Sequence, residues 1–449
     1  MSSDTRRALR DFVSLQRGTT YKGALVGLPG PVLLGLASIE PNGGFRYGGF
    51  KTYGGDCPEK ISLKSGDLYV SLKDVTQSGD LLGSIARVPS DIASGRLTQD
   101  TVKLVFDGDP VSRDYIYWLL RTPAYREYCR GCATGTTTLG LSRDDFLDFP
   151  VPSPAPADEL LIELLEGVEK RITLLRETNA TLEAIAQALF KSWFVDFDPV
   201  RAKAEGRQPE GMDAATADLF PDSFEETEQG LVPKGWEMST LGAICDASGG
   251  VIQTGPFGSQ LHASDYVAEG VPVVMPKDIF NRRVDANTAA RIGREDAQRL
   301  ARHQLRDGDI VFSRRGDVEK HALIGEAEIG WLCGTGCLLV RSGSRRRVAG
   351  YLSRSLDLPH TKQWLTQHAV GATMPNLNTG ILAAVPVLVP SDEVLGAFDE
   401  ATSVLDRRIS AGNAAAQTLT QLRDTLLPRL ISGQLRLPEA EARMAEVVS

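Results

Sequence analysis

A stretch with heptad spacing, residues 158–193, constrains the fold of this chain more than any other feature of its sequence. Apolar or small side chains recur there in alternating steps of four and three residues, and only Asn179 interrupts the row. Spacing this strict predicts a helix that pairs with another helix of similar length, because a helix packed on a globular body would show a wider apolar face. The side chains predicted to line this seam are Leu161, Leu165, Val168, Ile172, Leu175, Leu182, Ala186, Leu189 and Trp193.

A second heptad stretch, from Asp392 to about Ile431, supplies the expected partner helix in the same chain. Its apolar residues keep the same alternating steps over a similar length, with a few polar interruptions. We therefore expect the two long helices to pair as an antiparallel coiled coil. The residues predicted to pair are Leu395, Phe398, Leu405, Ile409, Leu419 and Leu426.

The two halves of the chain form an internal repeat. One pair of matching segments is LKSGDLYVSLKD (63–74) and LRDGDIVFSRRGD (305–317), and another is ATGTTTLGL (133–141) and AVGATMPNL (369–377). Each half has short β-rich runs punctuated by Gly and Pro, and then a predicted helix, at 113–129 with an interruption near Pro123, and at 348–368. A plain tandem duplication without paired helical arms is the alternative interpretation.

The order of these elements predicts an α+β fold, in which two similar domains are separated by two long helices pairing as an antiparallel coiled coil with pseudo-two-fold symmetry. The proline and acidic content of the segment between the first helix and the second domain predicts a loosely ordered linker. The predicted boundaries are 1–154 for the first domain, 155–200 for the central helix, 201–235 for the linker, 236–390 for the second domain, 391–436 for the C-terminal helix and 437–449 for a tail.

The formal net charge of −9 argues by itself against nucleic-acid binding, which needs clustered Lys and Arg. The average hides a basic stretch, however, because residues 282–347 hold fourteen Arg and Lys against nine Asp and Glu, a net of +5. This stretch predicts a basic working surface beside acidic helices, with an ordinary mixed-charge surface as the alternative. No apolar run is long enough for a membrane span and the N-terminus lacks a secretory pattern, so we expect a cytoplasmic protein with no membrane partner and with free thiols.

Polar and basic residues on the loops that follow the Gly-Asp strands are the candidates for DNA contact, because base edges in the major groove are recognised by long polar side chains and phosphates by positive charge. Arg314 and Arg315 in SRRGD are the strongest pair, with Lys73 and Gln77 at the equivalent place in the first half. An ordinary solvated surface is the alternative for each of them. The further candidates are Thr136, Thr137 and Asn376 in two turns, which alternatively only cap the domains, and Lys277, Arg282, Arg283 and Lys320 for phosphates.

Motifs for catalysis are missing from the sequence. It has no Gly-rich dinucleotide or nucleotide motif and no Asn/Asp-Pro-Pro-aromatic motif that would hold a base for methyl transfer. Cys129 and Cys132 form a C-x-x-C without a second pair at matching spacing, so we interpret them as small buried residues and not as zinc ligands. We therefore expect no catalytic residue, metal or cofactor in this chain.

Four stretches resemble the specificity subunit of type I restriction-modification systems: LFKSWFVDFDPV (189–200), LVPKGWEMSTLGAI (231–244), GATMPNL (371–377) and LLPRLISGQL (426–435). The resemblance implies two target-recognition domains, each contacting one half of a bipartite site in double-stranded DNA, and helices that act as a spacer. The first domain departs from the family pattern, since it has no PKGW start and has GTTTLGL where the second has GATMPNL.

The same resemblance implies the partners and cofactors of a larger complex. Two methyltransferase subunits would dock on the helices and bring S-adenosylmethionine, and a translocase-nuclease restriction subunit would bring ATP with Mg. The alternative from another class is a structural adaptor with two ligand-binding domains and no nucleic-acid role.

Overall fold

The computed structural model describes residues 7–48, 50–75, 78–106, 111–153, 156–227, 230–286, 288–344, 348–371 and 373–431. The chain divides into two compact units. The first contains the residues up to Leu174 together with those from Ala416 onward, and the second contains Leu175–Ala415. Each unit therefore holds one domain and a part of both long helices. In the part of the chain that the structure describes, no helix combines the length and apolarity that crossing a membrane requires.

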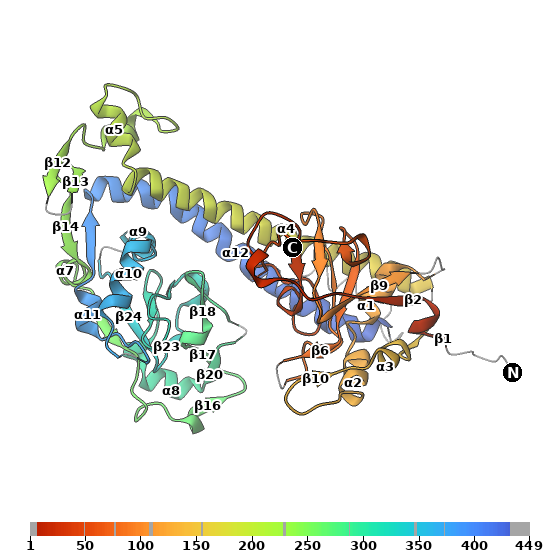
Figure 1. Ribbon diagram of the computed structural model, residues 1–449. Coiled ribbons are helices and arrows are strands. Elements are labelled where there is room, and N and C mark those ends of the chain that lie inside the picture. The colour runs from red at the N-terminus through yellow and green to blue at the C-terminus, as the bar shows by residue number, and fades with distance from the viewer. Residues whose placement is uncertain are drawn as a thin grey trace. The chain divides into compact units, whose positions relative to one another are not determined.

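The two predicted long helices are present as α4 (Pro156–Phe194) and α12 (Asp392–Ile431), which lie side by side in Figure 1. Asp158 and Glu159 occupy the first turn of α4, where carboxylates are favoured by the helix dipole. The pairing is antiparallel, because increasing residue numbers on α4 meet decreasing numbers on α12. The pairs that show this are Glu169 with Arg423, Asn179 with Asn413, and Phe190 with Phe398.

The predicted coiled-coil seam is confirmed by burial. In the first unit Leu161 and Leu165 share a core with Leu426 and Leu427, and in the second unit Phe190 packs with Leu395 and Phe398. Asn179, which interrupts the heptad row, is itself in the seam and is only 8% exposed. The buried predicted residues are Leu161, Leu165, Val168, Ile172, Ala186, Trp193, Leu395, Phe398, Ile409, Leu419 and Leu426, and the half-buried ones are Leu175, Leu182, Leu189 and Leu405.

The first domain is built on a four-stranded antiparallel sheet in the order β2-β9-β5-β7. Its strands are β2 (Val13–Arg17), β9 (Thr101–Phe106), β5 (Leu68–Ser71) and β7 (Ile85–Arg87). A smaller sheet has β3 (Val32–Leu34), β8 (Gly95–Leu97) and β4 (Ser62–Leu63), and two short ladders join β1 (Arg7–Ala8) to β11 (Pro150–Val151) and β6 (Lys73–Asp74) to β10 (Leu139–Gly140). The helices are α1 (Arg113–Leu119), α2 (Pro123–Gly131) and α3 (Arg143–Leu147).

The second domain repeats this plan with the sheet β15-β24-β21-β22. These strands are β15 (Val251–Thr254), β24 (Cys337–Arg341), β21 (Ile310–Ser313) and β22 (His321–Leu323). A second sheet has β16 (Tyr266–Val267), β20 (Ala290–Ile292), β17 (Val271–Val274) and β23 (Leu332–Cys333), and ladders join β14 (Glu237–Thr240) to β25 (Pro386–Val389) and β18 (Ile279–Phe280) to β19 (Arg283–Val284). The helices are α7 (Leu241–Ala247), α8 (Arg294–Arg299), α9 (Ala349–Leu356), α10 (Pro359–His368) and α11 (Thr379–Ala383).

The Gly-Asp motif occurs in both halves of the chain because each copy forms the same turn. Gly66 and Gly308 have φ of 81° and 83°, a left-handed conformation that suits glycine. The following aspartates close the turn in the same way, since Asp67 accepts from the backbone N–H of Lys64 at 2.8 Å and Asp309 from that of Arg306 at 2.7 Å. The motif is therefore structural, and it places the start of β5 and of β21.

Two predictions about local structure are wrong. The predicted single helix at 348–368 is two helices, α9 and α10, because Pro359 lacks an N–H and opens a new helix at its first position. The segment 201–235 is not a loosely ordered linker. It contains α5 (Asp198–Ala204), α6 (Ala214–Asp218) and the hairpin of β12 (Phe224–Thr227) and β13 (Gly230–Pro233).

Aromatic packing holds this folded segment against the end of α4. The rings of Trp193 and Phe220 lie 5.0 Å apart, and the ring of Phe197 lies 5.8 Å from Trp236 and 6.1 Å from Phe224. Buried aromatic pairs of this kind contribute more than their area alone. Composition predicted disorder because these few aromatic residues are diluted by acidic residues and proline in the sequence.

Candidate nucleic-acid interface

Two loops that are far apart in the sequence meet in the second domain. The residues after β21 pair with the turn before α11, since the Leu377 N–H donates to the Arg314 carbonyl at 2.9 Å and the Gly316 N–H to the Pro375 carbonyl at 3.0 Å. Arg315 and Asn376 form an isolated β-bridge, and residues directly opposite each other in a β-pair present their side chains on the same side. The structure therefore brings together Arg314, Arg315 and Asn376, which the sequence placed in separate motifs.

The first domain builds the same loop pair from different residues. Strand β6 pairs with β10, with Lys73 opposite Gly140, and the Leu141 N–H donates to the Leu72 carbonyl at 2.9 Å. Thr134 and Gly140 exchange backbone hydrogen bonds of 2.9 and 2.8 Å, and at the matching place in the second domain the Val370 N–H donates to the Asn376 carbonyl at 2.9 Å. We call the two loop pairs, 71–74 with 134–141 and 313–316 with 370–371 and 373–377, the recognition loops.

Glycine closes both turns for a steric reason. Gly135 has φ of 99° and Gly371 has φ of 111°. A Cβ at these positions would lie 2.4 Å from the Thr138 carbonyl oxygen and 2.7 Å from the Met374 carbonyl oxygen, which is too close for any side chain. The loop backbone is thus kept in both domains while its exposed residues differ.

The charges of the two recognition loops differ in how far they are neutralised within the described part of the chain. Arg315 is exposed and its guanidinium makes no ion pair or hydrogen bond to any residue that the structure describes. Lys73, at the matching place, lies 3.0 Å from Asp100. Thr136 and Thr137 are exposed in the turn of the first domain, and Gln77 lies outside the described residues.

Two buried polar atoms in the second recognition loop have no hydrogen-bond partner among the described residues. They are Nε of Arg314 and Oδ1 of Asn376. Orphaned buried polar atoms cost free energy, and a ligand group that satisfies them regains it. Such a pair in a basic loop is typical of a surface that is completed by a polar partner.

Two of the residues predicted to contact phosphates lie beside a carboxylate. The side chain of Arg282 is only 10% exposed and lies 2.6 Å from Glu183 of α4, and Arg283 lies 3.4 Å from the same carboxylate. Both guanidinium groups therefore join the domain to a helix and do not face solvent as free charges. The +5 stretch of the sequence is accordingly not one basic surface.

The other basic candidates are exposed but partly satisfied. Lys320 is paired with Asp317, and the ammonium of Lys277 donates to the Thr288 carbonyl at 2.7 Å. Exposed ion pairs of this kind are weak and exchange readily with a phosphate. These two lysines stay candidates for backbone contacts.

Burial, with Arg282 nearby, lowers the pKa of His321 from 6.5 to about 4. As the pH decreases, the unfolded chain binds this proton before the folded chain does. The free energy of unfolding should therefore fall by about 3 kcal/mol between a pH of about 6.5 and about 4, and it should not change for this reason above a pH of about 6.5. The substitution His321→Gln should flatten the slope in a series of denaturant titrations. An unchanged slope in His321→Gln would contradict the assignment.

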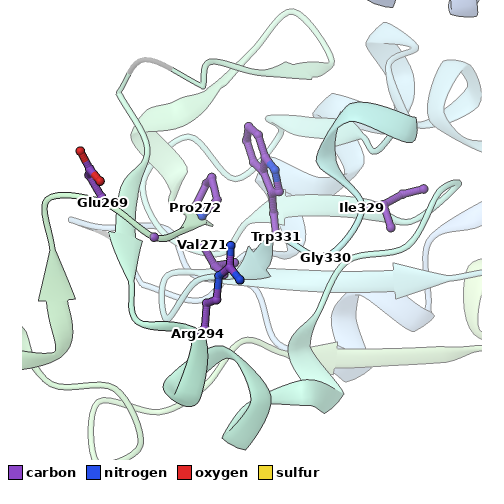
Figure 2. A pocket seen from close by; sticks show the side chains of 8 residues that line it. Glu269, Val271, Pro272, Arg294, Ile329, Gly330 and Trp331 are labelled. Carbon is purple, nitrogen blue, oxygen red and sulfur yellow. The ribbon is translucent and has the colours of Figure 1, made fainter.

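A surface depression of about 510 Å³ lies beside the sheet β16-β20-β17-β23 of the second domain. Figure 2 shows Val271 and Arg294 near its centre and Trp331 beside Pro272, whereas the side chains of Glu269 and Ile329 lie at opposite margins and point away. Acid–base or nucleophilic chemistry needs groups that converge on one point. The lining is therefore an open, mostly apolar surface, and it does not resemble an active site.

The six cysteines are unpaired. Burial raises the pKa of the Cys129 thiol to about 11, which keeps it protonated and unreactive at neutral pH. In the described ranges, no group of three or more His, Cys, Asp or Glu is placed to hold a metal ion. Cys129 and Cys132 lie in α2 and at its end, where the first packs in the core.

The fold and the loops together define a class of protein: a duplicated α+β domain on an antiparallel pair of helices, with basic loops at the same place in each domain. No family model matches the chain. It is 25% identical over 430 residues to the type I restriction enzyme HindI specificity subunit of Haemophilus influenzae, covering 82% of this chain and 89% of the relative. It is 23% identical over 343 residues to the MjaIX specificity subunit of Methanocaldococcus jannaschii, covering 76% and 73%.

A solved structure shares the fold. The S subunit of a type I restriction-modification system from M. genitalium superimposes with a TM-score of 0.55 over 96% of this chain and 97% of that chain, at 16% identity. The resemblance to specificity subunits that four sequence stretches predicted is thereby confirmed. The proteins that this chain resembles are the non-catalytic components of type I restriction systems.

Proposed function

We propose that this chain is a non-catalytic DNA specificity subunit of a type I restriction-modification complex and contacts one half of a bipartite DNA site with each domain. The observation that carries the proposal is the recognition loop, which is built by the same backbone hydrogen bonds in both domains and exposes a basic residue in each, Lys73 and Arg315. Backbone-supported loops on a rigid sheet are suited to present side chains to base edges.

The long helices supply the second part of the proposal. At roughly 1.5 Å per residue, about 33 paired residues span roughly 50 Å, which is more than one turn of duplex, so the two half-sites would lie on one face about a turn apart. The helices would also dock two methyltransferase subunits, which bring S-adenosylmethionine and modify an adenine in each half-site. Exposed apolar side chains support this role, since Leu160, Leu174 and Ile185 of α4 are 50–51% exposed. Restriction subunits with ATP and Mg would join for cleavage.

Replacing Arg315 by alanine is expected to weaken recognition of one half-site only. If Arg315 contacts a base, discrimination between base pairs at one position of the half-site should fall by about 1–3 kcal/mol. If it contacts a phosphate, affinity should fall for every DNA sequence, and the slope of log K against log salt concentration should drop in magnitude by about 0.9. Both are measured by binding the methyltransferase complex to libraries with each half-site randomised in turn. Lys73→Ala should have the same kind of effect on the other half-site.

The exposed Arg207, which lies outside both sheets and beside Glu205, provides a control with the same change of charge. Arg207→Ala should leave both half-sites and the salt slope as they were. An Arg315→Ala complex with unchanged affinity, salt slope and sequence preference would remove the second recognition loop from the interface.

A structural adaptor without a nucleic-acid role is the second candidate function, since the acidic helices and the surface depression on the second domain offer contacts to proteins. The two functions separate on salt dependence. A complex with its methyltransferase partner should bind duplex DNA with an affinity that falls steeply with salt, and a complex without sequence preference at any salt concentration would favour the adaptor.

A further inference from the structure

Three arginines of the second domain converge on the two long helices. Arg282 donates to Glu183 of α4 at 2.6 Å, and Arg283 approaches the same carboxylate at 3.4 Å. Arg354 of α9 donates to both oxygens of Asp406 of α12, at 2.9 and 3.2 Å. We call Arg282, Arg283, Arg354, Glu183 and Asp406 the Glu183 clamp.

The Glu183 clamp is shielded from water on its domain side. The side chain of Arg354 is 0% exposed and that of Arg282 is 10% exposed, while Glu183 and Asp406 are 37% and 21% exposed. Arg282 also donates to Ser353 Oγ at 3.0 Å, which fixes the direction of its guanidinium. Buried ion pairs add little to stability but depend strongly on geometry. The Glu183 clamp therefore favours one orientation of the second domain relative to the two long helices.

The turn that carries Arg282 is strained, which indicates that the side chain is needed there. Asn281 and Arg282 have φ of 46° and 60° at the centre of the two-residue hairpin between β18 and β19. Hairpin turns of this type favour glycine at the second position, and an arginine in the left-handed region persists only where its surroundings fix it. The Arg282 carbonyl accepts from the Leu323 N–H at 3.0 Å, so the turn is also tied to the main sheet.

The first domain is also joined to α4 by polar and charged contacts. Arg87 and Glu166 of α4 pair through two contacts of 2.8 Å, and Trp118 of α1 donates to Glu166 at 2.7 Å. Trp118 and Arg354 occupy the same place in the internal repeat, on α1 and α9. Arginine–glutamate contacts to α4 are thus present in both domains, which points to a role for the attachment itself.

We propose that the Glu183 clamp is a positioning device that fixes the angle of the second domain on the helix pair and so restricts the gap between half-sites that the subunit accepts. This inference rests on the proposed function. Apolar contacts such as those of Phe398 hold the domain on the helices but are not directional. The charged, bidentate contacts set the angle, and Glu183 and Asp406 act through the domain and not by touching DNA.

The first test follows the angle directly and does not involve DNA. Spin labels are placed at Ala188→Cys on α4 and Glu269→Cys in the second domain, both exposed positions, in a full chain whose partly exposed Cys57 and Cys132 are serine. Glu183→Gln should broaden the distribution of distances between the labels. Glu177→Gln, an exposed carboxylate on the same helix, is the matched control and should leave the distribution narrow. A distribution equally narrow in Glu183→Gln would overturn the clamp.

The second test measures the gap. The complex with its methyltransferase partner is given a DNA library with a varied gap between fixed half-sites. Glu183→Gln should raise methylation at gaps one base pair longer or shorter by roughly tenfold relative to the optimal gap, as expected for the loss of a partly buried ion pair, with both half-site sequences unchanged. A wild-type complex that methylates no specific site would refute the proposed function, and the label distances would still decide whether the clamp exists.

A variant that removes the strain distinguishes positioning from folding. Arg282→Gly suits the left-handed turn and should keep the folded chain intact in thermal unfolding, yet it removes the contact to Glu183. It should broaden both the label distances and the accepted gaps, as Glu183→Gln does. Arg282→Gly with wild-type distances and a wild-type gap would overturn the inference.

Discussion

Inserting one heptad into both long helices should lengthen the gap between the methylated half-sites by about three base pairs, since seven helical residues add roughly 10 Å and each base pair adds about 3.4 Å. The insertions belong between Leu174 and Leu175 in α4 and between Ala415 and Ala416 in α12, where the two compact units divide. A whole heptad keeps the apolar seam facing its partner, so the pairing survives. The gap is measured by mapping methylated adenines in a genome that carries the variant and its methyltransferase partner.

Both half-site sequences should stay unchanged in that experiment, because the recognition loops lie far from the insertions in sequence and keep their own hydrogen bonds. An insertion in α4 alone is the control. It moves Asn179 out of register with α12 and should lower the stability of the chain and abolish specific methylation. A double insertion that methylates sites with the original gap would contradict the spacer role of the helices.

The long helices could be predicted from the sequence because their signal is local and repeated. A heptad row identifies its own buried face, and each of the fifteen predicted seam residues is buried or half-buried. The interruption at Asn179 is also visible in the sequence, but its meaning is not. Only the structure shows that the Asn179 amide donates to Asn413 Oδ1 at 2.7 Å and to the Ile409 carbonyl at 3.2 Å across the seam.

The recognition loops could be predicted only in part. The repeat placed Lys73 and Arg315 at equivalent positions, but the contact of residues 313–316 with 370–371 and 373–377 is set by a chain closure over more than fifty residues, which no local pattern records. Local sequence patterns also cannot distinguish a basic side chain that is exposed to solvent from one that forms an ion pair with a carboxylate. Arg282 and Arg315 look alike in the sequence, and one is buried against Glu183 while the other is exposed.

The Glu183 clamp and the folded segment 201–235 were missed for a related reason. Each depends on residues whose partners lie on another element, as Glu183 does with Arg282 and Trp193 with Phe220. The one sequence signal that pointed to the clamp is the Asn281–Arg282 pair at the centre of a short hairpin, where Asn-Gly would be usual. Pseudo-two-fold symmetry between the two domains stays a prediction from the repeat.

The contact between Asn179 and Gly412 should show strong coupling in a double-mutant cycle. A Cβ at Gly412 would lie 2.4 Å from Asn179 Oδ1, so Gly412→Ala forces the amide out of its hydrogen bonds and should destabilise the chain by about 1–2 kcal/mol despite the better helix propensity of alanine. Asn179→Ala alone leaves a gap beside Gly412 and should cost about 1 kcal/mol. The double variant fills that gap and should be at least as stable as the wild type.

The coupling free energy expected from these values is about 2 kcal/mol or more, well above the few tenths found for independent sites, and denaturant unfolding of the four full-length chains measures it. Additive effects would show that the two residues do not meet. A buried asparagine in a coiled coil fixes the register of the helices at some cost in stability. A stable double variant would therefore show that Asn179 is not needed for stability and leave the register as its role. Since a shift of the helices past each other would alter the spacer, this variant should fold well and yet methylate sites with more than one gap, whereas the wild type keeps one.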